Sequence, residues 1–323
     1  MEKGKSSGFL ALGGLFVLLI LVPFFFRGYF QRHVAIMILM WSTIGVAWNM
    51  LAGYAGQTSL GHAVYFGIGA YTTGILFAKA NVTPWIGGIL GAFFAAVMAG
   101  GLGFPLFRLS GFYFSIATIA LGEIVWILFT NWDWVGGARG LFIPSVGDSW
   151  TFIQFSNKIP YYYIILSLFA ITFLAAYFLS KSRAGYYFRA VRDEYEAAMS
   201  LGVDIRKYKT LAYAFSAFFT ALAGAFYACY ILYIDPDSVL MGKISIQICF
   251  FTILGGIGEL WGPLAGAIAL IPISEFARIH FSGGGRAVDL LIYGILIVLF
   301  AIYQPHGVIG MFKKIHKWHR MRT

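Results

Sequence analysis

The chain has 323 residues, of which 60% are hydrophobic and only 11% are charged, and its mean hydropathy is +0.79. A soluble domain of this length could not enclose so much apolar surface, because much of the surface of a folded protein stays in water. The formal charge of +10 comes from basic residues in loops and tails, so membrane topology explains it and no nucleic-acid partner is expected. Composition predicts an all-α, polytopic transmembrane helix bundle that forms a single domain over residues 1–323.

Apolar runs long enough to cross a bilayer as helices recur along the whole chain. The eighth run is short and the ninth follows almost at once, so we expect about ten spans, with nine and eight as alternatives. The expected spans are residues 8–26, 33–51, 59–78, 84–107, 112–130, 160–180, 210–234, 244–257, 260–277 and 287–303.

The distribution of Lys and Arg predicts the orientation. With the amino terminus in the cytoplasm and ten alternating spans, the inner segments hold nearly twice as many basic residues as the outer segments. The excess of positive charge inside favours a cytoplasmic position for both termini. The segment 183–209 then lies in the cytoplasm, and the basic tail 311–323 lies there too, where it can contact anionic membrane lipid.

The segment 183–209 is a charged, amphipathic island in this apolar sequence. One predicted helical face carries apolar and aromatic residues at steps of three and four, and another carries charges. The apolar face holds Tyr187, Val191, Tyr195 and Ala198, and the charged face holds Arg189, Arg192, Asp193 and Glu196. Gly202 is expected to end this helix, and Asp204 to cap the next one. Either a lipid surface or a soluble partner could hold such a helix.

A glycine-rich polar stretch follows the second expected span. Gln57, Thr58, Ser59 and His62 lie among Gly53, Gly56 and Gly61. Irregular backbone at membrane depth is tolerated only inside protein or beside water, so these side chains could line a polar path. The alternative is an ordinary cytoplasmic turn in which Ser59 caps the next helix and His62 is a structural hydrogen-bonding residue.

Glu123 lies deep in the apolar run 112–130. An ionisable residue at such a depth is costly and usually faces a cavity or a partner, so a carboxylate that lines or gates a path is one interpretation. The other is a buried carboxylic acid hydrogen-bonded to Thr118, Ser115 or a neighbouring helix.

Signatures of enzymes and metal sites are missing. There is no G-x-S-x-G or H-E-x-x-H motif, and Cys229 and Cys249 stand alone in apolar runs, without metal-ligand spacing. Gly258, Gly262 and Gly266 recur at steps of four, which predicts a packing face of small residues. We therefore expect a transport subunit that is not an enzyme, binds no cofactor or metal, and has no nucleotide site of its own.

Four passages together resemble a known family. They are GYAGQTSLGHAVYFGIGAY at 53–71, FYFSIATIALGEI at 112–124, VGGARGL at 135–141, and the long run that starts RAVRDEYEAAMSLGVDIRKYK at 189–209 and is followed by GGIGELWGPLAGA. From about Trp48 to Pro305 the sequence resembles the M-type permeases of the Liv branched-chain amino-acid ABC transporters, a family that also includes urea-type permeases.

The resemblance implies partners and a mechanism. An external binding protein would deliver an amino acid, this chain and a second, H-type permease would form the path, and two cytoplasmic ATPases would hydrolyse ATP with Mg in the inner membrane of a prokaryote. Glu196-Ala197-Ala198-x-x-x-Gly202 matches the start of the loop that importers offer to their ATPases, although the later I-x-L-P part is absent. The expected coupling residues are Arg189, Arg192, Asp193, Glu194, Glu196, Ala197, Ala198 and Gly202, and the expected path residues are Gln57, Thr58, Ser59, His62, Thr118 and Glu123.

Two other functions remain open from the residues. A permease of the same kind could carry urea or short amides, and an ion-coupled secondary transporter could use Glu123 and His62 as proton carriers. A membrane enzyme is a third class, but it would need a constellation of polar residues at one depth, which the sequence does not show.

Overall fold

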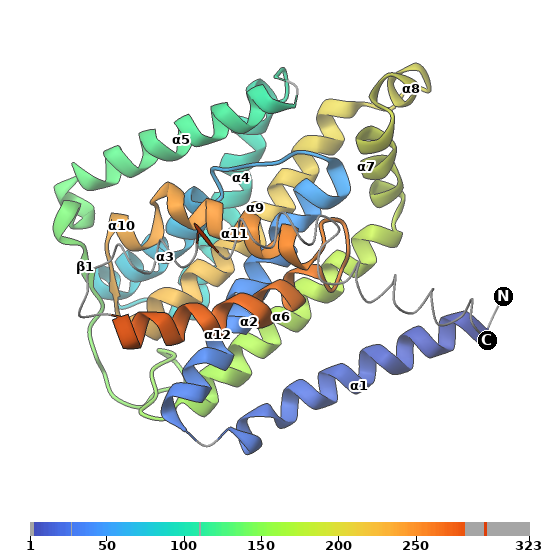
Figure 1. Ribbon diagram of the computed structural model, residues 1–323. Helices are drawn as coiled ribbons and strands as arrows, with labels where there is room; N and C mark the ends of the chain where they lie inside the picture. The colour runs from blue at the N-terminus through green and yellow to red at the C-terminus, as the bar shows by residue number, and fades with distance from the viewer. Residues whose placement is uncertain (1–2, 27, 110, 282–293, 296–323) are drawn as a thin grey trace.

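A computed structural model describes residues 3–26, 28–109, 111–281 and 294–295, and these residues are almost wholly helical (Figure 1). All of the expected tenth span, 287–303, except residues 294–295 lies outside the described residues, and so does the basic tail, 311–323. The principal helices are α1 (Lys3–Phe25), α2 (Tyr29–Asn49), α3 (Ala63–Ala80), α4 (Pro84–Leu106), α5 (Phe112–Thr130), α6 (Lys158–Lys181), α7 (Arg183–Asp193), α8 (Tyr195–Ser200), α9 (Ile205–Ile231), α10 (Pro236–Val239), α11 (Gly242–Gly255) and α12 (Gly262–Phe281).

Among the described residues, six helical segments are long and apolar enough to cross a membrane. They are Tyr29–Tyr54, Pro84–Leu106, Phe112–Thr130, Lys158–Lys181, Ile205–Ile231 and Pro236–Gly255. The all-α, polytopic architecture expected from composition is confirmed, and α5 occupies the expected run 112–130. The number of spans, between eight and ten, and the position of the termini stay predictions.

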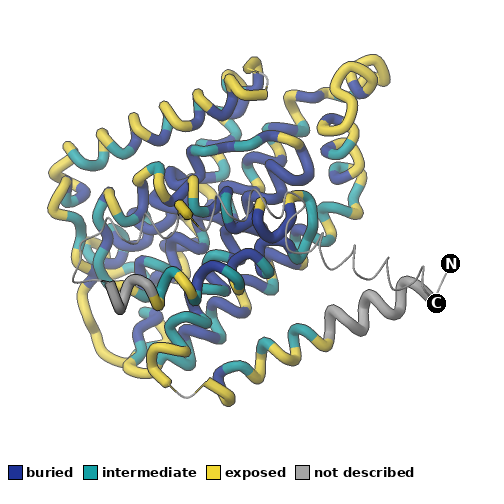
Figure 2. The backbone as a smooth tube through the Cα atoms, viewed as in Figure 1, coloured by how far each residue is buried: buried dark blue, intermediate teal, exposed yellow. Residues whose placement is uncertain are grey.

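The centre of the bundle is built from α2, α3 and α9, with α4 packed along them (Figure 2). Glycines let these helices approach at backbone distance. A Cβ atom at Gly69 of α3 would lie 1.9 Å from the carbonyl oxygen of Ala221, and one at Gly224 of α9 would lie 1.9 Å from that of Phe66. Close contact of this kind is how helices pack where no hydrophobic driving force operates between them.

Small residues also join α11 and α12. A Cβ at Gly262 would lie 2.2 Å from the Gly256 oxygen, and one at Gly266 would lie 1.9 Å from the Phe251 oxygen. The predicted packing face is confirmed for these two positions. Gly258 differs, because it lies in the turn before α12 with a φ of 80°, a conformation that favours glycine.

Loops at one end of the bundle are tied together by short strands and hydrogen bonds. β1 (Leu141–Phe142) pairs antiparallel with β2 (Tyr233–Ile234), and the short 3-10 turns η2 (Asp133–Val135) and η3 (Gly137–Arg139) precede β1. The Thr83 hydroxyl donates to the Thr151 oxygen at 2.6 Å. In Figure 1 this end lies opposite α7 and α8, so the described loops gather at two distinct ends.

Candidate functional site

The central helix α2 does not end as a regular helix. It continues as a π-helical turn, η1 (Met50–Tyr54), which is buried throughout. The side chain of Asn49 holds the turn before α12 at this point: its Oδ1 accepts from the Gly258 amide at 2.8 Å and its Nδ2 donates to the Glu259 oxygen at 3.0 Å. π-turns are rare and are frequent at functional sites.

An irregular loop, residues 55–62, follows η1 and lies against the first half of α5. The Ser115 hydroxyl donates to the Thr58 oxygen at 2.7 Å, and Thr118 Oγ1 accepts from the Leu60 amide at 3.0 Å. The Trp48 indole of α2 donates to the Ser59 oxygen at 2.8 Å. The structure therefore brings Thr58, Ser59 and Thr118 together, and side chains of α2 and α5 bind several backbone groups of the loop.

His62 is fully enclosed and does not line an open path. Its Nε2 lies 2.7 Å from the Ser216 hydroxyl of α9, and its ring lies 5.7 and 5.9 Å from the rings of Tyr65 and Tyr213. Its Nδ1 has no hydrogen-bond partner among the described residues. His62 is also the residue before α3, so the expectation that Ser59 caps this helix is wrong; the Ser59 hydroxyl instead accepts from the Gly61 amide at 3.4 Å.

Glu123 is exposed on α5 and is not hydrogen-bonded to Thr118 or Ser115, so of the partners expected for it only a neighbouring helix is left. Those two hydroxyls are occupied by the 55–62 loop, and Glu123 points from another face of the helix. Its carboxylate lies near the start of α11, because a Cβ at Gly242 would be 3.4 Å from Glu123 Oε1. The partial positive charge of a helix amino terminus favours a carboxylate there.

The segment 183–209 forms two helices and not one. The helical path breaks at Glu194, with φ −145° and ψ 88°, between α7 and α8. Val191 and Ala198 are buried together with Ile205 at the start of α9, whereas Tyr187 and Tyr195 of the same predicted face stay exposed. The prediction of one continuous helix is therefore wrong, and two of the four residues predicted for its apolar face are buried.

Both predicted helix boundaries in this segment are confirmed. Gly202 adopts a φ of 79°, while the Val203 amide donates to the Ala198 oxygen and the Gly202 amide to the Met199 oxygen. This pair of bonds is the Schellman arrangement that ends a helix at a glycine. The Asp204 carboxylate accepts from the Lys207 amide at 3.1 Å and caps α9.

Arg192 of α7 connects this segment to the π-helical turn. Its Nη1 donates to the Gly53 oxygen at 2.6 Å, and its Nε pairs with Asp193 at 2.8 Å. Gly56, with a φ of 69°, lies directly under the arginine stem, because a Cβ there would be 2.6 Å from Arg192 Cγ. Gln57 follows in the chain and is buried, with its Oε1 unpartnered among the described residues.

The remaining predicted coupling residues divide by exposure. Arg189 donates to the Ser180 oxygen at 2.7 Å and so braces α7 against the end of α6. Ala198 is buried and cannot contact another protein in this conformation. The others are on the surface: Asp193, Glu194, Glu196, Ala197 and Gly202.

Sequence reasoning missed two surface residues. Met199 and Leu201 at the end of α8 are 56% and 85% exposed, and α8 lies at a corner of the bundle in Figure 1. Exposed apolar side chains in a charged segment are candidates for a contact with another protein or with lipid. Their sequence signal is that two large apolar residues interrupt a charged segment; the prediction rested on the charged residues and did not include them.

Comparison with known proteins agrees with this architecture. The model of the family described as branched-chain amino acid transport system / permease component matches residues 32–301. The chain is 29% identical to the high-affinity branched-chain amino acid transport system permease protein LivM of Escherichia coli (strain K12), over 94% of this chain and 75% of that protein.

Two further relatives are more distant. LivH of Salmonella typhimurium, also named as a permease of that transport system, is 23% identical over 84% of this chain and 91% of its own length. The autoinducer 2 import system permease protein LsrC of Klebsiella pneumoniae is 28% identical over 58% of this chain and 52% of its own. No solved structure matches. Because the family model covers most of its length, the chain belongs to the branched-chain amino acid transport permease family and is a multi-pass protein of a prokaryotic inner membrane.

Proposed function

We propose that this chain is one of two permeases in an ATP-driven importer of branched-chain amino acids, with both termini in the cytoplasm. A second, H-type permease completes the path, two cytoplasmic ATPases bind at α7 and α8, and an external binding protein supplies the amino acid. The similarity to relatives named for branched-chain amino acid transport supports the substrate class, and the presence of both LivM and LivH among them supports a second permease.

The contact of Arg192 with Gly53 is the observation that carries the proposal. It joins an exposed pair of helices to the π-helical turn of α2, and the loop that leaves this turn is hydrogen-bonded to the first turns of α5. A displacement of α7 would therefore reach α5 through the Arg192–Gly53 hydrogen bond, the backbone of residues 53–58 and the Ser115–Thr58 hydrogen bond. Charge-assisted bonds of this kind are about twice as strong as neutral ones, so the link can transmit a movement.

The exposed face of α5 supports a path shared with a second permease. Glu123 lies near the middle of this 19-residue helix, among apolar residues that include Ile116, Ile119 and Ile127. An ionised carboxylate at the centre of a span facing lipid costs about 2.5–3.5 kcal/mol. Water in a path or a polar partner would remove this cost, and we place the translocation path on this face.

The end of α8 is the proposed contact with an ATPase. Met199 and Leu201 are exposed, and the charged residues Glu194 and Glu196 surround them. An apolar centre with a polar rim is the usual composition of an interface between proteins. Apolar side chains that fill a groove of the ATPase would stabilise the interface, so that α8 moves with the ATPase.

Isolation of the chain from its native membrane in mild detergent tests the proposal. Mass spectrometry is expected to identify a second permease and ATP-binding subunits in the same particle. Uptake by vesicles that contain the particle and the binding protein should then favour leucine over urea. Repeated recovery of the chain alone, after crosslinking, would contradict the assembly, and preference for urea would contradict the substrate.

A further inference from the structure

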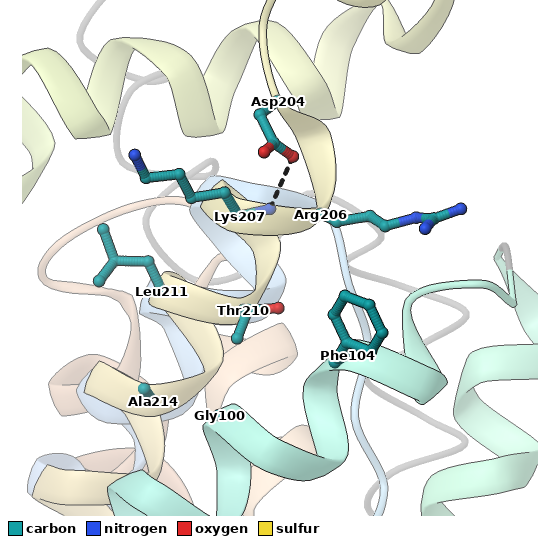
Figure 3. Close-up of a pocket in the computed structure, with 8 residues that line it drawn as sticks. All are labelled: Gly100, Phe104, Asp204, Arg206, Lys207, Thr210, Leu211 and Ala214. Carbon is teal, nitrogen blue, oxygen red and sulfur yellow. Dashed lines mark hydrogen bonds between the residues drawn. The ribbon is translucent and has the colours of Figure 1, made fainter.

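A groove lies between the last turns of α4 and the first turns of α9 (Figure 3). Its volume is about 590 Å³, and it is open to the surface. Gly100 and Phe104 form one wall, and Thr210, Leu211 and Ala214 form the other. A Cβ added at Gly100 or at the adjacent Gly101 would meet nothing within 4 Å, so the absence of side chains there leaves the groove open.

Cations surround the mouth of the groove. Arg206 and Lys207 begin α9, and in Figure 3 their side chains extend to opposite sides above Phe104 and Leu211. Neither side chain forms a hydrogen bond or ion pair with the described residues. The guanidinium of Arg108 adds a third positive charge, 5.8 Å from the centre of the Phe104 ring. Asp204 is the one carboxylate lining the groove, and it accepts the Lys207 amide as the helix cap.

The apolar part of the groove continues a surface that belongs in hydrocarbon. The exposed side of α4 is apolar over its length, from Trp85 through Phe93 and Val97 to Phe104. On α9, Leu211 and Phe215 extend the same kind of surface below the cations. A soluble partner cannot reach positions that lie beneath the membrane surface, whereas an acyl chain can, so the floor of the groove selects a lipid.

We propose that the groove binds an anionic phospholipid. The phosphate lies among Arg206, Lys207 and Arg108, and an acyl chain runs over Gly100 between Phe104 and Leu211. Charge and shape both fit this occupant, because unpaired cations end an apolar channel where anionic headgroups gather on a membrane surface. The assignment of the lipid to the cytoplasmic leaflet rests on the proposed orientation. The assignment of an anionic lipid rests on the cations and the apolar groove and not on the orientation.

Two variants remove the two halves of the site separately. Arg206→Gln/Lys207→Gln removes charge and leaves the channel, and Gly100→Leu fills the channel and leaves the charge. Both changes are at exposed or open positions, and leucine favours a helix more than glycine does, so folding is preserved. Lys181→Gln/Arg183→Gln is the matched control, because it removes the same charge from exposed residues near the same end of the bundle.

The full chain with its associated subunits is purified from membranes in mild detergent, incubated with equal phosphatidylglycerol and phosphatidylcholine, and analysed by native mass spectrometry. The wild type and the control should retain phosphatidylglycerol preferentially, and each test variant should retain about tenfold less of it. Thermal unfolding checks that all four proteins are folded. Unchanged retention in either test variant, or equal retention of the two lipids by the wild type, overturns the proposal. Loss of an ATPase from the Arg206→Gln/Lys207→Gln protein with its lipid retained also overturns it, and assigns the cations to protein docking.

Discussion

Arg192 lies on a surface helix, but its side chain contacts the interior of the chain, which its charge does not predict. Sequence periodicity places it on the charged face of a surface helix, and in the structure its guanidinium reaches inward to the Gly53 oxygen. It therefore acts between two parts of this chain, whereas Glu196, the second residue of α8, is exposed and can contact a partner. Two residues from one predicted face thus have different roles.

Replacement of Arg192 by Gln should separate ATP hydrolysis from transport. The loss of a charge-assisted hydrogen bond, about 1.5–3 kcal/mol, predicts a fall in uptake of about tenfold or more, while ATPase subunits stay bound and active. Arg183→Gln is the control, because it removes the same charge from the same segment at an exposed position. Uptake and hydrolysis are measured on the same vesicles, and equal uptake by both variants would refute the role of Arg192.

Gly56→Ala should weaken the same link from its other side. The new Cβ would lie 2.6 Å from Arg192 Cγ, and the φ of 69° disfavours any residue with a side chain. Gly147→Ala is matched, because its φ is 82° and a Cβ there meets nothing within 4 Å. Both variants should lose about 1 kcal/mol of stability from backbone strain. We expect only Gly56→Ala to lose uptake, and similar uptake in the two variants would contradict this.

The pair α7 and α8 is the element through which the chain would meet an ATPase. It is fixed to the bundle at three places: by Arg189 on the α6 end, by Arg192 on η1, and by the buried cluster of Val191, Ala198 and Ile205. Such a brace keeps the pair rigid while its far end, at Met199 and Leu201, stays in solvent. Coupling of ATP hydrolysis to transport requires that α7 and α8 move together with the rest of the chain.

Met199→Ser/Leu201→Ser should release the ATPases without harming the chain. Both side chains are exposed, so the thermal stability of the isolated chain is expected to change by less than about 0.5 kcal/mol. The loss of two apolar anchors should reduce co-purified ATPase about tenfold or more. Val146→Ser, an exposed apolar residue at the opposite end of the bundle, is the control. Full ATPase recovery with the double variant would exclude α8 as the docking element.

Regular elements could be predicted from the sequence, and their interruptions could not. The run 112–130 contains no proline or other helix-breaking signal, and α5 occupies it. Gly202 and Asp204 act through hydrogen bonds within their own helix ends, so the sequence predicts their roles too. The break at Glu194 has no local signal, because the apolar spacing of Val191 and Ala198 continues through it. The π-helical turn of α2 likewise forms where Asn49 and Arg192 bind distant backbone groups.

The candidate path also combines features that the sequence predicts with features that it does not. Thr58, Ser59 and Thr118 could be foreseen as neighbours of a glycine-rich loop at membrane depth, and the structure brings them together. The exposure of Glu123 could not be foreseen, because it depends on which face of α5 the loop occupies. Nor could Ser59 be excluded as a cap, since α3 begins only after the loop has crossed α5 and met Ser216 and Ser245.

At the scale of the molecule, the outer face of α5 is an apolar surface interrupted by the carboxylate of Glu123. α5 lies at the edge of the bundle, and its outer residues are exposed along most of their length (Figure 2). The central helices α2, α3 and α9 are by contrast enclosed, with His62 sealed among aromatic rings. His62 is therefore inaccessible to solvent in this conformation, and under the proposed function the outer face of α5 is the surface that a second subunit would complete.

Glu123→Cys in the assembled transporter should react with a small, charged, water-soluble thiol reagent, because water reaches the path. Phe94→Cys on the exposed side of α4 is the control, and it should stay unreactive because it faces lipid. Background is low, since Cys229 and Cys249 are both buried. Mass spectrometry of the labelled chain gives the extent of reaction, and equal protection of both positions would place Glu123 in lipid or in a dry interface.

The energy source of transport tests the central claim most directly. Vesicles that contain the purified particle, with ATP and Mg inside and the binding protein outside, are supplied with labelled leucine. An ATP-driven importer should accumulate leucine only when ATP and the binding protein are present, and a protonophore should leave the initial rate unchanged. Accumulation by this chain alone, driven by a proton gradient and abolished by the protonophore, would contradict the account and would make Glu123 the carrier of the coupled proton.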